Sequence, residues 1–117
     1  GGWGTAVSVL LASKGYCVWL WSWKAEESAR LKADYENKEF LPGIALPESI
    51  TFSNSLEDCI SQAELIVCAT PSAAVRATTS AMAPYVQDGQ IILNISKGLD
   101  PNTLKRLSEV EYIPVMI

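Results

Sequence analysis

Three short and almost unbroken apolar runs constrain the fold of this chain more than any other feature. They are YCVWLW at residues 16–21, ELIVCAT at residues 64–70 and QIILNI at residues 90–95. Runs of this kind are typical of strands that are covered on both faces, as strands of parallel sheets are. Helical segments are expected between them, so strands alternate with helices. The pattern predicts an α/β fold built on a doubly wound, mostly parallel sheet.

The segments between these runs contain helix signals. A helix is expected from Thr5 to about Gly15, a residue placed to end a helix. Ser55 is expected to cap a short helix that carries Glu57 and Asp58 in its first turn. Further helices are expected over residues 24–37, 71–83 and 102–110.

Two weaker strands and one loop complete the expected organisation. Short strands are expected at residues 50–53 and 112–117. Residues 40–47 (FLPGIALP) are expected to form a loop, because two prolines and a glycine interrupt regular structure. The chain shows no repeat and no internal domain boundary, so residues 1–117 are interpreted as one domain.

Composition excludes several functions. With 117 residues, of which 49% are apolar and 19% charged, the chain is expected to be globular. The formal net charge of −4 disfavours nucleic-acid binding, because a basic face supplies most of that affinity. No apolar run reaches the roughly 18 residues of a membrane span, and no signal segment opens the sequence. We therefore expect a cytoplasmic protein.

The side chains available for chemistry are limited. The sequence has no histidine, so acid–base chemistry must come from Lys, Asp, Glu, Tyr or a cofactor. Cys17, Cys59 and Cys68 are odd in number and lack Cys-x-x-Cys spacing. Because Cys17 and Cys68 lie in apolar runs, we expect buried free thiols, and neither a metal site nor a disulfide.

The glycines at Gly1, Gly2 and Gly4 resemble the end of a phosphate-binding turn. In a dinucleotide-binding fold, Gly-x-Gly-x-x-Gly joins the first strand to the first helix. If Gly4 is the third glycine of this pattern, Gly1 is the second. The first glycine and the first strand would then precede residue 1, so we interpret the sequence as a fragment. The alternative is a flexible N-terminal linker that happens to be rich in glycine.

The end of the first apolar run is the second candidate site. An acidic residue normally binds the adenosine ribose of NAD about 20 residues after the glycines. Here the sequence is Ser22-Trp23-Lys24, with no acid. Lys24 and Ser22 could bind a 2′-phosphate, and Trp23 could stack on adenine. We expect NADP to be accepted, whereas the alternative is a solvated lysine beside packing tryptophans.

The other two apolar runs also end in candidate residues. Pro71 follows the run at 64–70 and would hold a turn whose helix amides face the nicotinamide half of a dinucleotide. Lys97 follows the run at 90–95, and its ammonium could polarise a ketone or pair with a substrate phosphate. The alternatives are an ordinary strand-to-helix connection and a solvated lysine. We expect all three strand ends to face one crevice.

Several longer segments resemble one enzyme family. GGWGTA, VWLWS, NKEFLPGIALPESI, ATPSAAVRA, SKGLD and TLKRLSEV occur in the order and at the spacing of the bacterial NAD(P)-dependent glycerol-3-phosphate dehydrogenases. The resemblance implies a Rossmann-like cofactor domain without its first strand. It also implies reversible, NAD(P)H-dependent reduction of dihydroxyacetone phosphate to sn-glycerol 3-phosphate, which feeds glycerophospholipid synthesis.

The resemblance also implies roles for individual residues. Gly2 and Trp3 would contact the cofactor phosphates, Trp23 would face the adenosine, and Phe40 would lie near the cofactor at a position where the family often has tyrosine. Lys97 would touch both the nicotinamide and the substrate. The family usually has arginine or histidine at the position of Trp23.

The family's helical second domain is not represented in these residues. By resemblance, that domain supplies the proton-relay lysine and most groups that bind the substrate phosphate. The isolated chain is therefore expected to be nearly inactive, and a homodimer is expected for the whole protein. Two other functions remain open: a different dehydrogenase of the β-hydroxyacid or nucleotide-sugar group, and a noncatalytic nucleotide-binding module.

Overall fold

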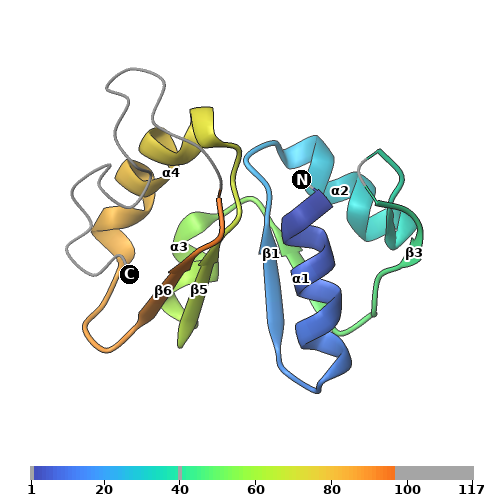
Figure 1. The fold of residues 1–117 in the computed structure, drawn as a ribbon, viewed down its shortest axis with the longest axis horizontal. Coiled ribbons are helices and arrows are strands. Elements are labelled where there is room, and N and C mark those ends of the chain that lie inside the picture. The colour runs from blue at the N-terminus through green and yellow to red at the C-terminus, as the bar shows by residue number, and fades with distance from the viewer. Residues whose placement is uncertain (1, 40, 97–117) are drawn as a thin grey trace. The chain divides into compact units, whose positions relative to one another are not determined.

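The computed structural model describes residues 2–39 and 41–96. The chain divides into two compact units, Gly1–Cys59 and Ile60–Ile117 (Figure 1). The helix expected at 102–110 and the strand expected at 112–117 lie outside the described residues.

The first unit contains one parallel strand pair, a small antiparallel hairpin and two helices. Its elements are α1 (Gly2–Ser13), β1 (Val18–Trp21), α2 (Ala25–Asp34), β2 (Glu36–Asn37), β3 (Leu41–Ala45) and β4 (Ile50–Ser53), followed by the start of α3 (Leu56–Ser61). Strands β1 and β4 are parallel, with Val18 opposite Ile50. Val18 and Ile50 form a core with Leu31 and Leu46, against which part of α1 packs.

Helix α1 ends in a glycine-dependent reversal. Gly15 has a φ of 90°, which side chains rarely tolerate. Its amide donates to the Ala12 carbonyl at 3.0 Å, and the Tyr16 amide donates to the Leu11 carbonyl at 3.2 Å. This pair of bonds is a Schellman motif. The predicted end of the helix is confirmed, whereas its start is at Gly2 and not at Thr5.

The prediction that residues 24–37 are all helical is wrong at the C-terminal end. Helix α2 ends at Asp34, because Tyr35 adopts the left-handed conformation with φ 48°. The Tyr35 amide donates to the Leu31 carbonyl at 2.8 Å, and the chain then enters β2. No local signal marks the change, since tyrosine is rarely found at positive φ.

The prediction that residues 40–47 form a loop is also wrong, because β3 pairs with β2 in an antiparallel hairpin. The ladder joins Glu36 to Ala45 and Asn37 to Leu41. Pro42 is not among the paired residues, so its missing amide hydrogen breaks no rung. A carboxylate oxygen of Glu36 accepts a bond from the Gly43 amide at 3.3 Å, which adds a link between the two strands.

The second unit has one parallel strand pair and a helix. Its elements are β5 (Leu65–Cys68), η1 (Ser72–Ala74), α4 (Val75–Met82), η2 (Ala83–Tyr85) and β6 (Ile91–Asn94). Leu65 lies opposite Ile91 in the ladder. Val75, Met82 and Ile92 are fully buried. The helix expected at 71–83 begins as a short 3-10 turn.

Strand–helix–strand connections with parallel strands make this a Rossmann-like α/β fold, as predicted. The described strands form three two-stranded sheets, whereas one mostly parallel sheet without its first strand was expected. Coverage on both faces was also expected, yet in β6 the side chains of Ile91 and Leu93 are exposed on either side of buried Ile92. The short strand at 50–53 and the Ser55 cap are confirmed, since Ser55 Oγ accepts from the Asp58 amide at 3.2 Å.

The three cysteines are free thiols but differ in burial. Cys68 is buried at the end of β5, and Cys59 is half-buried in α3. Cys17 is exposed and precedes β1, so the expectation that it is buried in a strand is wrong. Burial raises the pKa of the Cys68 thiol to about 11. Burial also raises the pKa of the Cys59 thiol, and the nearby Asp58 carboxylate raises it further. A hydrogen bond with Ser53 acts in the opposite direction and offsets part of this increase.

Iodoacetamide at pH 8 is expected to modify Cys17 first and Cys68 last in the folded protein. The thiolate is the nucleophile, and a thiol whose pKa is about 11 is almost wholly protonated at that pH. Timed labelling followed by peptide mass spectrometry measures the order. In urea the three sites should react at similar rates, and modification of native Cys68 ahead of Cys17 would contradict the burial described here.

Candidate functional site

The first turn of α1 and the carboxyl end of β1 lie at the same end of the first unit. The reversal at Gly15 folds α1 back along β1, so the helix and the strand run in opposite directions (Figure 1). The amides that begin a helix have no acceptor within it, and the helix dipole is positive there. This end of the unit is therefore suited to an anion such as a diphosphate.

Two of the N-terminal glycines, Gly2 and Gly4, lie in that first turn. Gly2, Trp3 and Gly4 are the first three residues of α1, and Gly1 lies outside the described residues. The Trp3 side chain is 58% exposed. Ser8 Oγ donates to the Gly4 carbonyl at 2.8 Å, one turn along the helix. Gly2 and Gly4 have no side chain, so at these two positions a ligand can approach the backbone closely, on either side of Trp3 in the sequence.

The carboxyl end of β1 presents an exposed indole and an ammonium group. Trp23 is 70% exposed, and Lys24 Nζ lies 4.8 Å from the centroid of its ring. Ser22 is buried, with its amide donating to the Ser53 carbonyl at 3.0 Å. Of the two groups considered for a 2′-phosphate, Lys24 is thus the accessible one. Glu26 lies in the first turn of α2, so the charge here is mixed.

In the second unit, one serine holds the two strand ends together. Ser96 Oγ lies 2.7 Å from the Thr70 carbonyl and 3.3 Å from the Cys68 carbonyl. The Ser96 amide donates to Asn94 Oδ1 at 2.9 Å. Because these contacts join the chain after β6 to the chain after β5, Ser96 fixes the backbone immediately before residue 97.

Pro71 lies at the start of the 3-10 turn that follows β5. It is exposed, with φ −54° and ψ 144°, and its carbonyl accepts from the Ala74 amide at 2.8 Å. The expected role in holding this turn agrees with that geometry. No role was predicted for Ser96, although a hydroxyl residue directly after an apolar run was a usable signal.

The structure brings together some of the predicted site residues. Gly2, Trp3, Gly4 and Trp23 all belong to the first unit, and Pro71 to the second. Gly1, Phe40 and Lys97 lie outside the described residues. The expectation that all strand ends face one crevice stays a prediction.

Within residues 2–39 and 41–96, no group of three or more His, Cys, Asp or Glu side chains could hold a metal ion. None of the helices in this part of the chain is both long enough and apolar enough to cross a membrane.

Comparison with protein families gives a match over nearly the whole chain. Residues 1–113 match the family described as NAD-dependent glycerol-3-phosphate dehydrogenase N-terminus. A glycerol-3-phosphate dehydrogenase [NAD(P)+] of Agathobacter rectalis is 44% identical over 110 residues, which is 94% of this chain and 33% of the relative. The corresponding protein of Chlorobium phaeobacteroides is 42% identical over 118 aligned residues, or 99% of this chain and 35% of the relative.

Solved structures show the same fold. The crystal structure of glycerol-3-phosphate dehydrogenase from Coxiella burnetii matches with a TM-score of 0.86 and 29% identity, over 93% of this chain and 33% of that one. The glycerol-3-phosphate dehydrogenase of Saccharomyces cerevisiae has a TM-score of 0.77 over 93% of this chain and 35% of that one. At 22% identity, the yeast structure supports the fold alone.

Replacing Ser96 with alanine is expected to loosen the two strand ends of the second unit. Loss of a half-buried hydroxyl that donates to backbone carbonyls should lower the free energy of unfolding by about 1 kcal/mol. Urea unfolding measures this change. Ser13→Ala is the matched control, because Ser13 Oγ also donates to a carbonyl, that of Leu10 at 2.7 Å, but on the exposed surface of α1. Equal stability of the two variants would remove the role assigned to Ser96.

Proposed function

We propose a function for this chain from its family, because it belongs to the NAD-dependent glycerol-3-phosphate dehydrogenase N-terminal domains. The chain is the cofactor-binding part of an enzyme that reversibly reduces dihydroxyacetone phosphate to sn-glycerol 3-phosphate with NADPH or NADH. The family match over residues 1–113 is the observation that carries this proposal. The chain spans about a third of the length of the curated relatives it matches.

The first turn of α1 is assigned to the cofactor diphosphate. Gly2, Trp3 and Gly4 supply amides at a helix N-terminus, where a diphosphate is stabilised by hydrogen bonds and by the helix dipole. The glycines let the phosphates approach the backbone closely. Gly1 is assigned to the same turn by its position in the sequence.

The carboxyl end of β1 is assigned to the adenosine. The exposed ring of Trp23 offers a stacking surface for adenine. The Lys24 ammonium is a partner for a 2′-phosphate, and the carboxylate of Glu26 partly offsets its charge. We therefore assign both NADP and NAD as cofactors.

Residues at the strand ends of the second unit are assigned to the nicotinamide and the substrate. The nicotinamide, when bound, exchanges a hydride with C2 of the substrate. Pro71 holds the turn after β5, and Ser96 holds the backbone that leads to Lys97. The Lys97 ammonium is assigned to the substrate and Phe40 to the cofactor, both by family resemblance. The proton-relay lysine is assigned to a helical domain outside these residues.

Cellular context follows from the same assignment. The substrate is a small three-carbon phosphate, and the product serves glycerophospholipid synthesis. The enzyme is proposed to work in the cytoplasm as a homodimer.

The test is to purify the protein that carries this sequence and to follow NADPH and NADH oxidation with dihydroxyacetone phosphate. Both cofactors should bind, and at least one should be oxidised. Lys97→Ala should slow turnover by a factor equivalent to several kcal/mol of barrier, about a hundredfold or more. The control is Lys32→Ala, which changes an exposed lysine on α2.

The outcomes separate the open functions. Binding without oxidation when dihydroxyacetone phosphate is added would favour a different dehydrogenase or a noncatalytic module. Near-normal kinetics of Lys97→Ala would remove that residue from the site.

Replacing Lys24 with alanine is expected to shift cofactor preference. Loss of the ammonium should raise the dissociation constant for NADPH about five- to tenfold and leave that for NADH nearly unchanged, because only NADPH carries the 2′-phosphate. Isothermal titration calorimetry measures both constants, with Lys32→Ala again as the control. Equal changes for the two nucleotides would contradict recognition of the 2′-phosphate by Lys24.

A further inference from the structure

A buried hydrogen bond joins the β2–β3 hairpin to the first turn of α1. Asn37 Nδ2 donates to Thr5 Oγ1 at 2.9 Å, across 32 residues of sequence. Asn37 is 4% exposed and Thr5 is 1% exposed, so water does not compete for this bond. Thr5 directly follows Gly4 in α1, within one helical turn of the amides assigned to the diphosphate.

The hairpin holds Asn37 in place from both sides. The ladder shifts register between Glu36 and Asn37, and irregularities of this kind redirect a side chain. The Leu46 amide donates to the Tyr35 carbonyl at 2.7 Å, which closes the base of the hairpin. The backbone on either side of residue 37 is therefore fixed.

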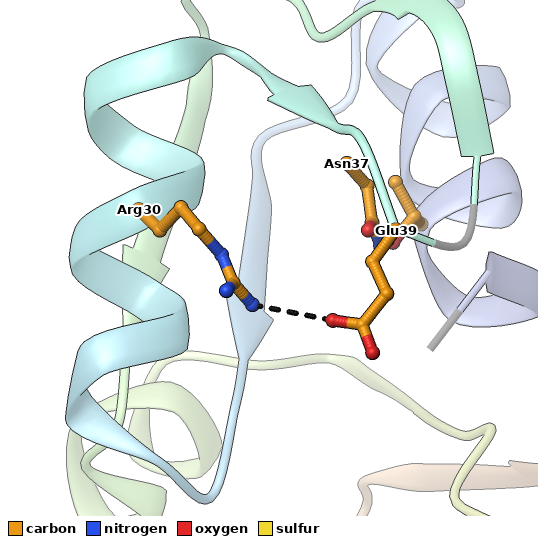
Figure 2. A network of polar contacts seen from close by, with 4 residues as sticks. Arg30, Asn37 and Glu39 are labelled. Atoms are coloured by element: carbon orange, nitrogen blue, oxygen red, sulfur yellow. Dashed lines mark hydrogen bonds and ion pairs between the residues drawn. The ribbon is translucent and has the colours of Figure 1, made fainter.

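The hairpin is also linked to α2, but by weaker contacts. Arg30 pairs with Glu39 at 3.5 Å, as Figure 2 shows, and Lys38 pairs with Asp34 at 3.4 Å. The side chains of Arg30 and Glu39 are more than half exposed, and exposed ion pairs add little stability. The buried bond of Asn37 is thus the stronger polar tie of this hairpin.

A polar pair is not needed to fill this space. Apolar side chains of similar shape would pack there without the cost of removing two polar groups from water. The hydrogen bond restricts the orientation of Thr5, because it forms only when the Thr5 hydroxyl faces the Asn37 amide group. An oriented Thr5 fixes the rotation of the first turn of α1, and hence where its amides point.

We propose that Asn37 is a positioning residue for the cofactor: through Thr5 it holds the first turn of α1 in the orientation that binds the diphosphate. This inference rests on the proposed function, since it gives the α1 amides their ligand. If the first turn of α1 samples other orientations, the apparent affinity for the nucleotide falls in proportion to the fraction of molecules in which the turn has the orientation that binds the diphosphate.

The experiment measures nucleotide affinity and local order in the same variants of the protein that carries this sequence. Asn37→Ala should raise the dissociation constants for NADPH and NADH alike, about five- to tenfold, as expected from loss of one buried hydrogen bond. Thr5→Val, which keeps the shape and removes the acceptor, should have the same effect. The double variant should be little worse than either single one, because both remove the same bond.

Hydrogen exchange provides the readout that does not depend on nucleotide. The amides of residues 6–8 should exchange faster in Asn37→Ala than in the wild type. Two controls separate positioning from stability. Thr5→Ser keeps the hydroxyl and should bind as the wild type does. Ile50→Val removes a methylene from the buried core of the same unit, and should lower the melting temperature without changing affinity or exchange in α1.

Unchanged affinity in Asn37→Ala, or a loss no greater than in Ile50→Val, would overturn the inference. If the wild-type protein binds neither NADPH nor NADH, the proposed function fails and the affinity part of the inference fails with it. The exchange rates then decide separately whether Asn37 orders the first turn, because they are measured without nucleotide.

Discussion

The reversal of the chain at Gly15 is the constraint on which the rest of the first unit depends. A residue with a side chain would resist the φ of 90° found there, and the two bonds of the Schellman motif need that conformation. The reversal brings α1 back along β1 and places the first helical turn beside the carboxyl end of the strand. The glycine amides and the Trp23–Lys24 pair then lie at one end of the unit, although about 20 residues separate them in the sequence.

Sequence patterns predicted the parts of this fold that local physics decides. The apolar runs became β1, β5 and β6, and Ser55 and Gly15 mark helix ends, because each signal acts over a few residues. The β2–β3 hairpin was not predictable in the same way. Pro42 and Gly43 weaken every local strand signal. They are accommodated in β3 because this strand pairs with β2, a segment that the pattern had assigned to a helix.

The residues of the candidate site also differ in whether a local sequence pattern could identify them. The N-terminal glycines, Trp23, Lys24 and Pro71 were candidates because their residue types suit a nucleotide, and Trp23, Lys24 and Pro71 also follow strands. Ser96 and Asn37 were not, since their roles lie in bonds to Thr70 and Thr5, which are distant in sequence. Residue type alone does not show which buried polar group a side chain will meet. Only the folded structure shows that Ser96 bonds to the Thr70 carbonyl and Asn37 to the Thr5 hydroxyl.

The exposure of Trp23 gives the protein an optical property. An indole in contact with water emits at longer wavelength than one in a dry core, and indole emission overlaps the absorption of a reduced nicotinamide ring. Trp23 is 70% exposed and lies at the end of β1 assigned to adenosine. Its fluorescence therefore responds both to the loss of surrounding water and to energy transfer when a reduced cofactor settles nearby. If Trp23 stacks on adenine as proposed, the same side chain also reports nucleotide binding.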